Sequence, residues 1–400
     1  MHTFFISISC IVLFFLVFPF LKVLIGLFSR LIIQPKGRPI AYDFACIITA
    51  YKNVGISLPL VHSLLKQKYR NFHIYLVADE CDPAEFNFSD SRLTTFFPSP
   101  PLRLKAKSII YAVDRFERPH NYTVIFDADN LAHPDFLQEM NSYANSECKA
   151  IQGQRTAKNL DTIYTCADAT GEFYKNYVER FIPHRIGSSA VISGSGMAVA
   201  SNIYQDYLNS KEIQQGKKLW KKMLQEDKVL QNFLLRNNET IAYAPKAIVY
   251  DEKATTGEQV ETQRSRWLYS YFQNIPNAAG LIWCGIKNCS FNQLLFGLVT
   301  ISPPLFILLF SAVLLSLIGL LINPFISLLL IAGVGVFLLN IFLSLYLSNV
   351  PNNIWRALWA IPFFIIKQTT ALFKMGNPNK NFKHSEHSRS VHIEEILGEV

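Results

Sequence analysis

Long apolar runs near both ends of the chain constrain its fold more than any other feature. The runs cover residues 4–21, 294–322 and 325–347, and they contain almost no charged side chains. A helix needs about 20 mostly apolar residues to cross the hydrocarbon core of a bilayer. We therefore expect an N-terminal transmembrane anchor within residues 1–35 and two transmembrane helices within residues 293–348.

The N-terminal run is better explained as an uncleaved anchor than as a signal peptide. It starts Met-His-Thr, without a basic n-region, and no small-residue cleavage site follows it. Lys22, Arg30, Lys36 and Arg38 come after the apolar core, and positively charged flanks remain on the cytoplasmic side. We expect an integral protein of the plasma (inner) membrane whose central domain is cytoplasmic.

The C-terminal region and the remaining composition exclude several other classes. Residues 354–375 suit an interfacial helix, with a third C-terminal span as the alternative, and residues 376–400 are expected to form a flexible tail. The seven cysteines show no paired spacing, so no structural disulfide is predicted. Basic residues cluster beside the membrane segments, which favours contact with anionic lipid over nucleic acid, and no nucleic-acid motif is present.

The central region, residues 40–290, alternates short apolar strands with helical patterns. Strands are expected at residues 44–50, 71–78 and 123–126, with helices near 57–67 and 106–116. This order indicates an α/β domain with a mostly parallel sheet, whose ligands bind beyond the carboxyl ends of the strands. The last part, near residues 260–290, is expected to form interfacial helices.

Acidic residues follow two of these strands. Asp79 follows the second strand, and Asp127 and Asp129 follow the third with one residue between them. Side chains two apart in an extended chain point the same way, so the last pair could hold Mg²⁺ or Mn²⁺ on its carboxylates. Such a cation would neutralise a diphosphate leaving group. A solvated turn can also contain this pattern, so its meaning depends on the motifs that follow.

A second acidic pair, Glu226-Asp227, lies in a helical pattern over residues 220–235. An acidic pair on a helix is often only a solvated face. An enzyme that activates a sugar hydroxyl, however, needs a carboxylate general base within hydrogen-bond reach of that hydroxyl.

The third motif is Q-R-S-R-W at residues 263–267. On a helix, Gln263, Arg266 and Trp267 fall at i, i+3 and i+4 and share one face. That face could bind phosphate oxygens and stack on a sugar ring. An amphipathic helix on the membrane surface is the alternative, and both interpretations are compatible.

In this order, the motifs resemble those of the membrane-bound family 2 glycosyltransferases, the group of the cellulose and hyaluronan synthases. The resemblance covers nearly the whole chain and rests on Asp79, Asp127-Ala128-Asp129, Glu226-Asp227 and the Q-R-S-R-W motif between apolar runs. It implies the GT-A type of α/β fold, a mixed, mostly parallel sheet flanked by helices, together with N- and C-terminal transmembrane helices. It also implies inverting transfer from a nucleotide-sugar, most often a UDP-sugar, with Mg²⁺ or Mn²⁺ on Asp127 and Asp129.

The resemblance also implies roles for individual residues. Asp227, beside Glu226, would be the catalytic base. A basic donor contact is expected some tens of residues after Asp79; Lys107 is a candidate, and the sequence does not choose between it and Lys105. The other implied contacts are Thr49, Tyr51, Asp79, Asp127, Asp129, Gln263, Arg264 and Arg266 for the donor, and Gly194, Ser195, Gly196 and Trp267 for the acceptor.

Two departures keep alternatives open. Glu80 and Cys81 follow Asp79 where the family often has Ser and Gly, and the chain has fewer apolar runs than the large synthases. We expect transfer to a growing polysaccharide or glycan, with a partner membrane subunit as a possible requirement. The alternatives are single-sugar transfer to a lipid, as in ceramide-type glucosyltransferases, and a non-catalytic membrane scaffold.

Overall fold

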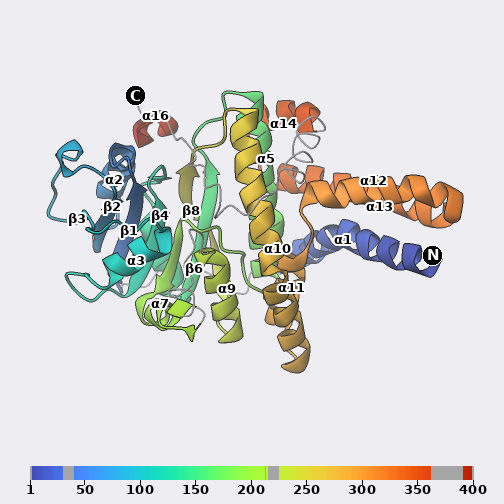
Figure 1. Cartoon of the computed structure of the whole chain (residues 1–400), viewed down its shortest axis with the longest axis horizontal. Coiled ribbons are helices and arrows are strands. Elements are labelled where there is room, and N and C mark those ends of the chain that lie inside the picture. Colours follow the sequence, from blue (N-terminus) through green and yellow to red (C-terminus); the bar gives the residue numbers. More distant parts are fainter. Residues whose placement is uncertain (1, 30–39, 212, 215–224, 362–390, 399–400) are drawn as a thin grey trace. The chain divides into compact units, whose positions relative to one another are not determined.

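The chain forms two compact units in a computed structural model that describes residues 2–29, 40–211, 213–214, 225–361 and 391–398 (Figure 1). The sheet unit consists of residues 33–159, 189–253 and 377–400. The helical unit consists of residues 1–32, 160–188 and 254–376.

The sheet unit is built on eight strands in the order β3-β2-β1-β4-β7-β6-β8-β5. Strands β3, β2, β1 and β4 run parallel to one another, as do β6 and β8, whereas β7 runs antiparallel to both β4 and β6, and β5 runs antiparallel to β8. The predicted fold, a mixed and mostly parallel sheet, is therefore confirmed. The strands are β1 (Phe44–Tyr51), β2 (Phe72–Asp79), β3 (Leu93–Phe96), β4 (Tyr122–Asp127), β5 (Leu131–Ala132), β6 (Ala150–Ala157), β7 (Met197–Ala200) and β8 (Ile241–Asp251).

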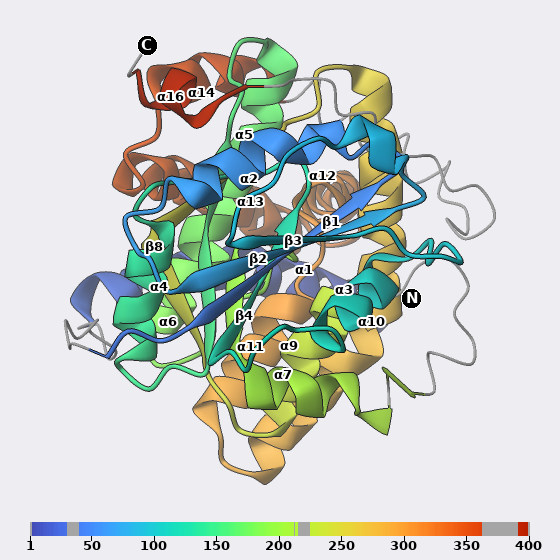
Figure 2. The same ribbon diagram turned by 90° about the vertical axis from the view of Figure 1, so that its left-hand side faces the viewer.

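Helices cover both faces of the strands, so the central strands are buried throughout. Every residue of β2 is buried, which explains why it reads as a continuous apolar run and not as an alternating one. Figure 2 shows α2 on one side of the strands and α3 and α7 on the other. The helices of this unit are α2 (Leu58–Leu65), α3 (Lys105–Val113), α4 (Phe136–Ala144), α7 (Ser201–Leu208), α9 (Glu226–Arg236) and α16 (Ile393–Leu397).

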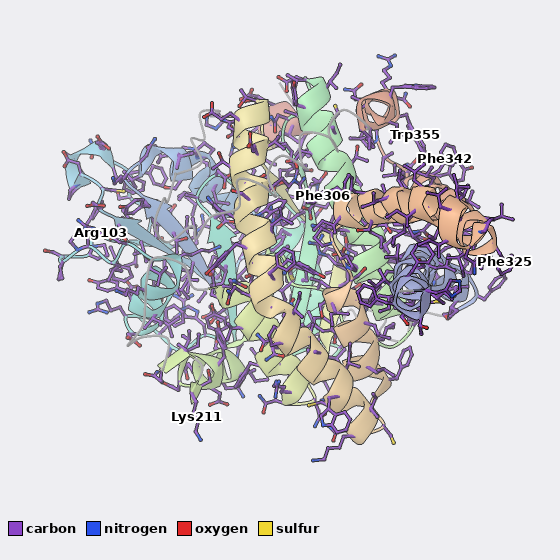
Figure 3. All side chains as sticks on the ribbon, turned by 45° about the vertical axis from the view of Figure 1, so that its right-hand side comes forward. Arg103, Lys211, Phe306, Phe325, Phe342 and Trp355 are labelled. Atoms are coloured by element: carbon purple, nitrogen blue, oxygen red, sulfur yellow. The ribbon has the colours of Figure 1, made fainter. Side chains whose placement is uncertain are left out.

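Three helices of the helical unit, among the residues described, are long and apolar enough to cross a membrane: α1 (His2–Phe28), α12 (Leu305–Ile322) and α13 (Pro324–Leu347). Helices α1 and α13 pack closely, because a Cβ atom at Gly333 would lie only 2.6 Å from Leu13 Cδ1. Phe325 and Phe342 of α13 point outward (Figure 3) and are 66 % and 55 % exposed. Such apolar surface suits a lipid environment.

The apolar run at residues 294–322 differs from the single span that we expected. It is divided between α11 (Phe291–Ile301) and α12, and Pro303 and Pro304 lie in the break. Proline lacks the N–H that a continuous helix needs, so α12 begins only at Leu305.

Two predicted C-terminal segments are described only in part. Helix α14 (Asn352–Ala357) and the 3₁₀ turn η4 (Leu358–Ala360) begin the expected interfacial segment, and residues 362–375 lie outside the described residues. In the expected tail, residues 376–390 also lie outside them. Helix α16 follows, with Ile393 buried and Glu394 paired with Lys66, which directly follows α2.

The rest of the helical unit comes from two separate parts of the chain. The first part is α5 (Ile163–Lys175), the π-helix η3 (Asn176–Phe181) and α6 (Ile182–Arg185). These residues lie within the predicted 40–290 domain but pack with the helical unit. The second part begins with α10 (Gly257–Lys287), in the region expected to form interfacial helices.

Candidate active site

Three segments of the sheet unit meet at the ammonium group of Lys105, the first residue of α3. Its Nζ lies 2.6 Å from Asp127 Oδ1 at the end of β4 and 2.9 Å from the carbonyl oxygen of Gly194. Glu226 Oε1, at the start of α9, lies 3.7 Å away. The structure thus gathers the D-A-D turn (residues 127–129), the small-residue loop (residues 193–197) and the Glu226-Asp227 pair around one cation.

Burial and neighbouring charges shift the ionisation of this cluster. Burial raises the pKa of Glu226 to about 7, against the opposing attraction of Lys105. Burial acts to lower the pKa of Lys105, but Asp127 and Glu226 outweigh it and the net shift is upward. Lys105 therefore stays charged, whereas Glu226 titrates near neutral pH.

Asn130 connects the D-A-D turn to the small-residue loop. Its Oδ1 accepts the N–H of Asp127 at 3.0 Å and the hydroxyl of Ser195, and its Nδ2 donates to Asp129 Oδ1 at 3.4 Å. The carboxylates of Asp127 and Asp129 have the hard oxygens that Mg²⁺ and Mn²⁺ prefer. Among the described residues no group of three His, Cys, Asp or Glu side chains is placed to hold a metal ion.

The small-residue loop needs its glycines. Gly194 has φ +81° and Gly196 has φ +63°, a region that other L-residues rarely adopt. A Cβ atom at Gly196 would lie 2.9 Å from Val249 Cγ2, and one at Gly194 would lie 3.8 Å from the Asp227 carboxylate. The backbone of the loop therefore lies directly beside Asp227.

The carboxyl ends of β1 and β2 form a neighbouring cluster. Both oxygens of Asp79, which is buried, accept backbone N–H groups, from Leu102 at 2.7 Å and from Arg103 at 2.5 Å. Asp79 thus holds the segment that leads into α3. The next residue, Glu80, accepts the Tyr51 hydroxyl at 2.5 Å and pairs with Arg103 at 2.8 Å. Thr49 of β1 lies opposite Asp127 in the strand register.

The Q-R-S-R-W motif lies on α10 of the helical unit. Arg264 Nη2 is 2.5 Å from Asp168 Oδ1 of α5, and the guanidinium lies 4.6 Å from the centre of the Trp267 ring. Lys175 Nζ is 5.5 Å from the same ring. Gln263 Oε1 is buried and has no hydrogen-bond partner among the described residues. Within this motif, Arg264 anchors α10 to α5.

Comparison with known proteins then decides the family. Residues 41–270 match the family model described as glycosyltransferase like family 2. The chain belongs to this family. It is therefore a glycosyltransferase that uses a nucleotide-sugar donor. Among curated proteins, no sequence matches it.

Solved structures add a likeness of fold. The mannosyltransferase PcManGT from Pyrobaculum calidifontis, in complex with GDP-Man and Mn²⁺, aligns with a TM-score of 0.59 at 12 % identity, over 94 % of this chain and 99 % of that one. TarS residues 1–349 from S. aureus, in complex with UDP, align with a TM-score of 0.39 at 13 % identity, over 60 % and 65 % of the two chains. The first similarity shows a shared fold, and the second is too weak to support an argument.

Several residues that contact the candidate site of this glycosyltransferase were not identified from the sequence alone. Glu80 and Asn130 directly follow predicted site residues, so their positions at strand ends were a usable signal. Asp168 had no such signal, because its partner Arg264 is 96 residues away along the chain. Of the two candidate lysines, Lys105 contacts Asp127, whereas Lys107 lies two positions further along α3, where a helix no longer presents the same face.

Proposed function

We propose that the glycosyltransferase binds its donor diphosphate beside Lys105 and transfers the sugar with inversion to a hydroxyl that lies at the small-residue loop. The observation that supports this most is the convergence of Asp127, Gly194 and Glu226 on the Lys105 ammonium. A fixed cation in a partly buried site stabilises the negative charge that a departing nucleoside diphosphate acquires.

On the donor side, Asp127 and Asp129 would hold Mg²⁺ or Mn²⁺, which when bound neutralises the diphosphate. The Mn²⁺ in the PcManGT complex supports a divalent cation here. Tyr51 and Glu80 lie at the strand ends where the nucleoside would bind. The donor base follows from neither fold nor family, so UDP- and GDP-sugars are both candidates.

On the acceptor side, Asp227 would act as the general base. It lies against the backbone of Gly194, where the glycine leaves room for a ligand to approach. Asp227 removes the proton of the acceptor hydroxyl, and the hydroxyl oxygen bonds to the anomeric carbon. The bond from that carbon to the diphosphate oxygen breaks, and its electrons leave with the diphosphate, next to Lys105.

We infer that the reaction takes place at the cytoplasmic face of the plasma (inner) membrane. The three apolar helices support membrane anchorage, and the basic residues after α1 favour a cytoplasmic site. The acceptor would be a growing polysaccharide or glycan. Single-sugar transfer to a lipid is the second candidate, because the described residues contain only three candidate spans and offer few helices to line a polymer channel.

Nucleotide release from sealed membrane vesicles tests this proposal. Vesicles are offered UDP- and GDP-sugars with Mg²⁺ or Mn²⁺, and the wild type is compared with Asp129→Ala and Asp227→Asn. We expect release with one donor, only when the cytoplasmic face is accessible, and a loss of at least about 100-fold in both variants. Release that is normal in Asp227→Asn would refute the assigned base, and release at the outer face would refute the topology.

A further inference from the structure

Arg155 of strand β6 and Lys158, which directly follows the strand, contact the two loops of the site, and neither side chain has a role in the proposed transfer step. In the register of β6 with β8, Ala157 lies opposite Asp251. Arg155, two residues before Ala157, projects on the same side of the strand and is a diagonal neighbour of Asp251. Lys158 directly follows the strand and is paired with Glu252. Two cations three residues apart therefore face two consecutive carboxylates.

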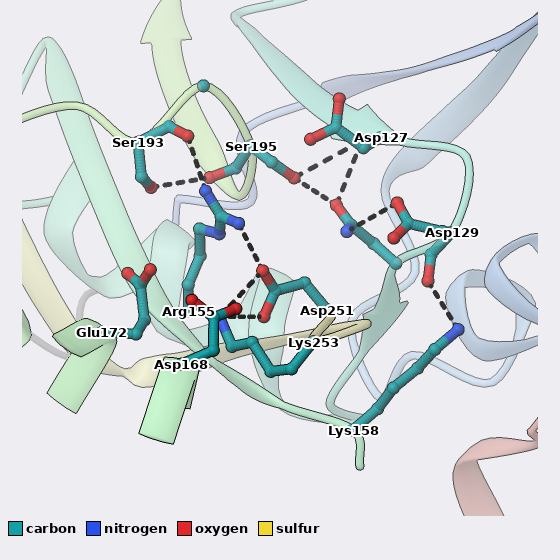
Figure 4. A network of polar contacts seen from close by, with 12 residues as sticks. Asp127, Asp129, Arg155, Lys158, Asp168, Glu172, Ser193, Ser195, Asp251 and Lys253 are labelled. Carbon is teal, nitrogen blue, oxygen red and sulfur yellow. Dashed lines mark hydrogen bonds and ion pairs between the residues drawn. The ribbon is translucent and has the colours of Figure 1, made fainter. Parts of the chain in front are cut away.

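Arg155 holds the small-residue loop. One guanidinium nitrogen donates to the carbonyl oxygen of Ser193 at 2.8 Å, and the other donates to Asp251 (Figure 4). Lys253 Nζ lies 2.9 Å from the same carboxylate. The Arg155, Asp251 and Lys253 side chains are only 16 %, 7 % and 5 % exposed. A planar guanidinium can make both bonds at once, and Asp251 fixes its orientation.

Lys158 holds the D-A-D turn in the same manner. Its Nζ donates to the carbonyl oxygen of Asp129 at 2.9 Å and lies 3.6 Å from Glu252 Oε2. The Lys158 and Glu252 side chains are 3 % and 8 % exposed. Asn159 fixes the chain after β8 by bonding both the N–H and the carbonyl of Lys253.

These buried charges are not explained by packing. Buried ion pairs are often no more stabilising than apolar residues of similar size, because both charges lose their hydration. Each cation here makes one bond that no apolar side chain could make, to the backbone of one site loop.

We propose that Arg155 and Lys158 are positioning residues with separate tasks: Arg155 sets the acceptor loop (the small-residue loop) and Lys158 sets the donor-binding D-A-D turn. Assigning the loops to acceptor and donor rests on the proposed function. The positioning itself rests only on the contacts of β6.

Hydrogen exchange tests the positioning without any substrate. Arg155→Lys keeps a positive charge near Asp251 but lacks the second donor arm, and Lys158→Met keeps the aliphatic stem without the ammonium. Lys149→Met is the matched control, since Lys149 directly precedes β6 and forms an exposed pair with Glu239. We expect the larger increase in exchange at residues 193–197 in Arg155→Lys, the larger increase at 127–131 in Lys158→Met, and no increase at either loop in the control. Equal effects on both loops, or on neither, would overturn the proposal.

Steady-state kinetics then test the separate tasks. We expect Arg155→Lys to raise the acceptor KM about tenfold with the donor KM within about twofold, and Lys158→Met to do the reverse. Both KM values rising together in each variant would overturn the division of tasks. If the wild type releases no nucleotide while the exchange pattern is as expected, the proposed function fails and the positioning stands.

Discussion

At Lys105, a single ammonium faces two carboxylates, Asp127 and Glu226, that would otherwise repel one another. The carboxylates differ in their distance from it, 2.6 Å for Asp127 and 3.7 Å for Glu226. The negative charge of the Asp127 carboxylate is thus compensated by a close ion pair with Lys105. Glu226 is the group whose charge changes near neutral pH.

The raised pKa of Glu226, about 7, predicts how activity depends on pH. Above this value Glu226 is ionised and supports the position of Lys105; below it Glu226 is protonated and that support is lost. We expect kcat/KM for the donor to fall as the pH decreases through about 7. In Glu226→Gln, which resembles the protonated form, activity should be low and this dependence absent. A wild-type kcat/KM that is constant from pH 6 to 8 would contradict the role of Glu226. So would a Glu226→Gln variant whose kcat/KM still falls as the pH decreases through this range.

Candidate site residues could be picked out from the sequence only where a short motif of suitable chemistry occurs in the expected order along the chain. The D-A-D turn and the Glu226-Asp227 pair were recognisable because short motifs follow strand or helix boundaries. The choice between Lys105 and Lys107 was not, because it depends on where α3 begins and which face it presents. Likewise, the burial of Asp79 against the backbone of Leu102 and Arg103 depends on a loop with no sequence pattern.

Among the elements, α10 carries the Q-R-S-R-W motif and is tied to α5 by an ion pair within that motif. The pair of Arg264 and Asp168 joins the two helices, with side chains only 15 % and 5 % exposed. Removing one partner of a buried ion pair leaves the other charge without compensation and costs about 3–5 kcal/mol. Arg264 of the motif therefore has a structural role, which is separate from any contact that the motif makes with the donor.

We predict that Asp168→Asn lowers the free energy of unfolding of the helical unit by about 3–5 kcal/mol and reduces sugar transfer. Asp206→Asn is the control, because Asp206 lies on the exposed side of α7 and should change neither property. Thermal unfolding in detergent and nucleotide release measure the two effects. An Asp168→Asn protein as stable as the control would show that the pair does not anchor α10.

The elements themselves were largely predictable. Strands β1, β2 and β4 and helices α2 and α3 appear within a few residues of their predicted positions, because buried parallel strands leave long apolar runs. The break between α11 and α12 was missed because Pro303-Pro304 lies inside an apolar run. The assignment of residues 160–188 to the helical unit could not be predicted, since it depends on long-range contacts such as Asn340 with Tyr174.

At the scale of the whole molecule, the chain is divided between a helical unit, whose described residues include three candidate spans, and a sheet unit in which distant segments meet. Lys105, Asp127, Gly194 and Glu226 come from four separate places in the sequence, and the sheet brings them together. In the proposed reaction, donor and acceptor chemistry both depend on this convergence.

The most direct test compares Lys105→Met with Lys107→Met, two equal losses of charge on the same helix. Nucleotide release is measured in purified membranes with the preferred donor and a divalent cation. We predict a loss of about 100-fold or more for Lys105→Met, since it removes the charge beside the leaving group, and a change within about twofold for Lys107→Met. Equal activity in the two variants, or a larger loss at Lys107, would contradict the site described here.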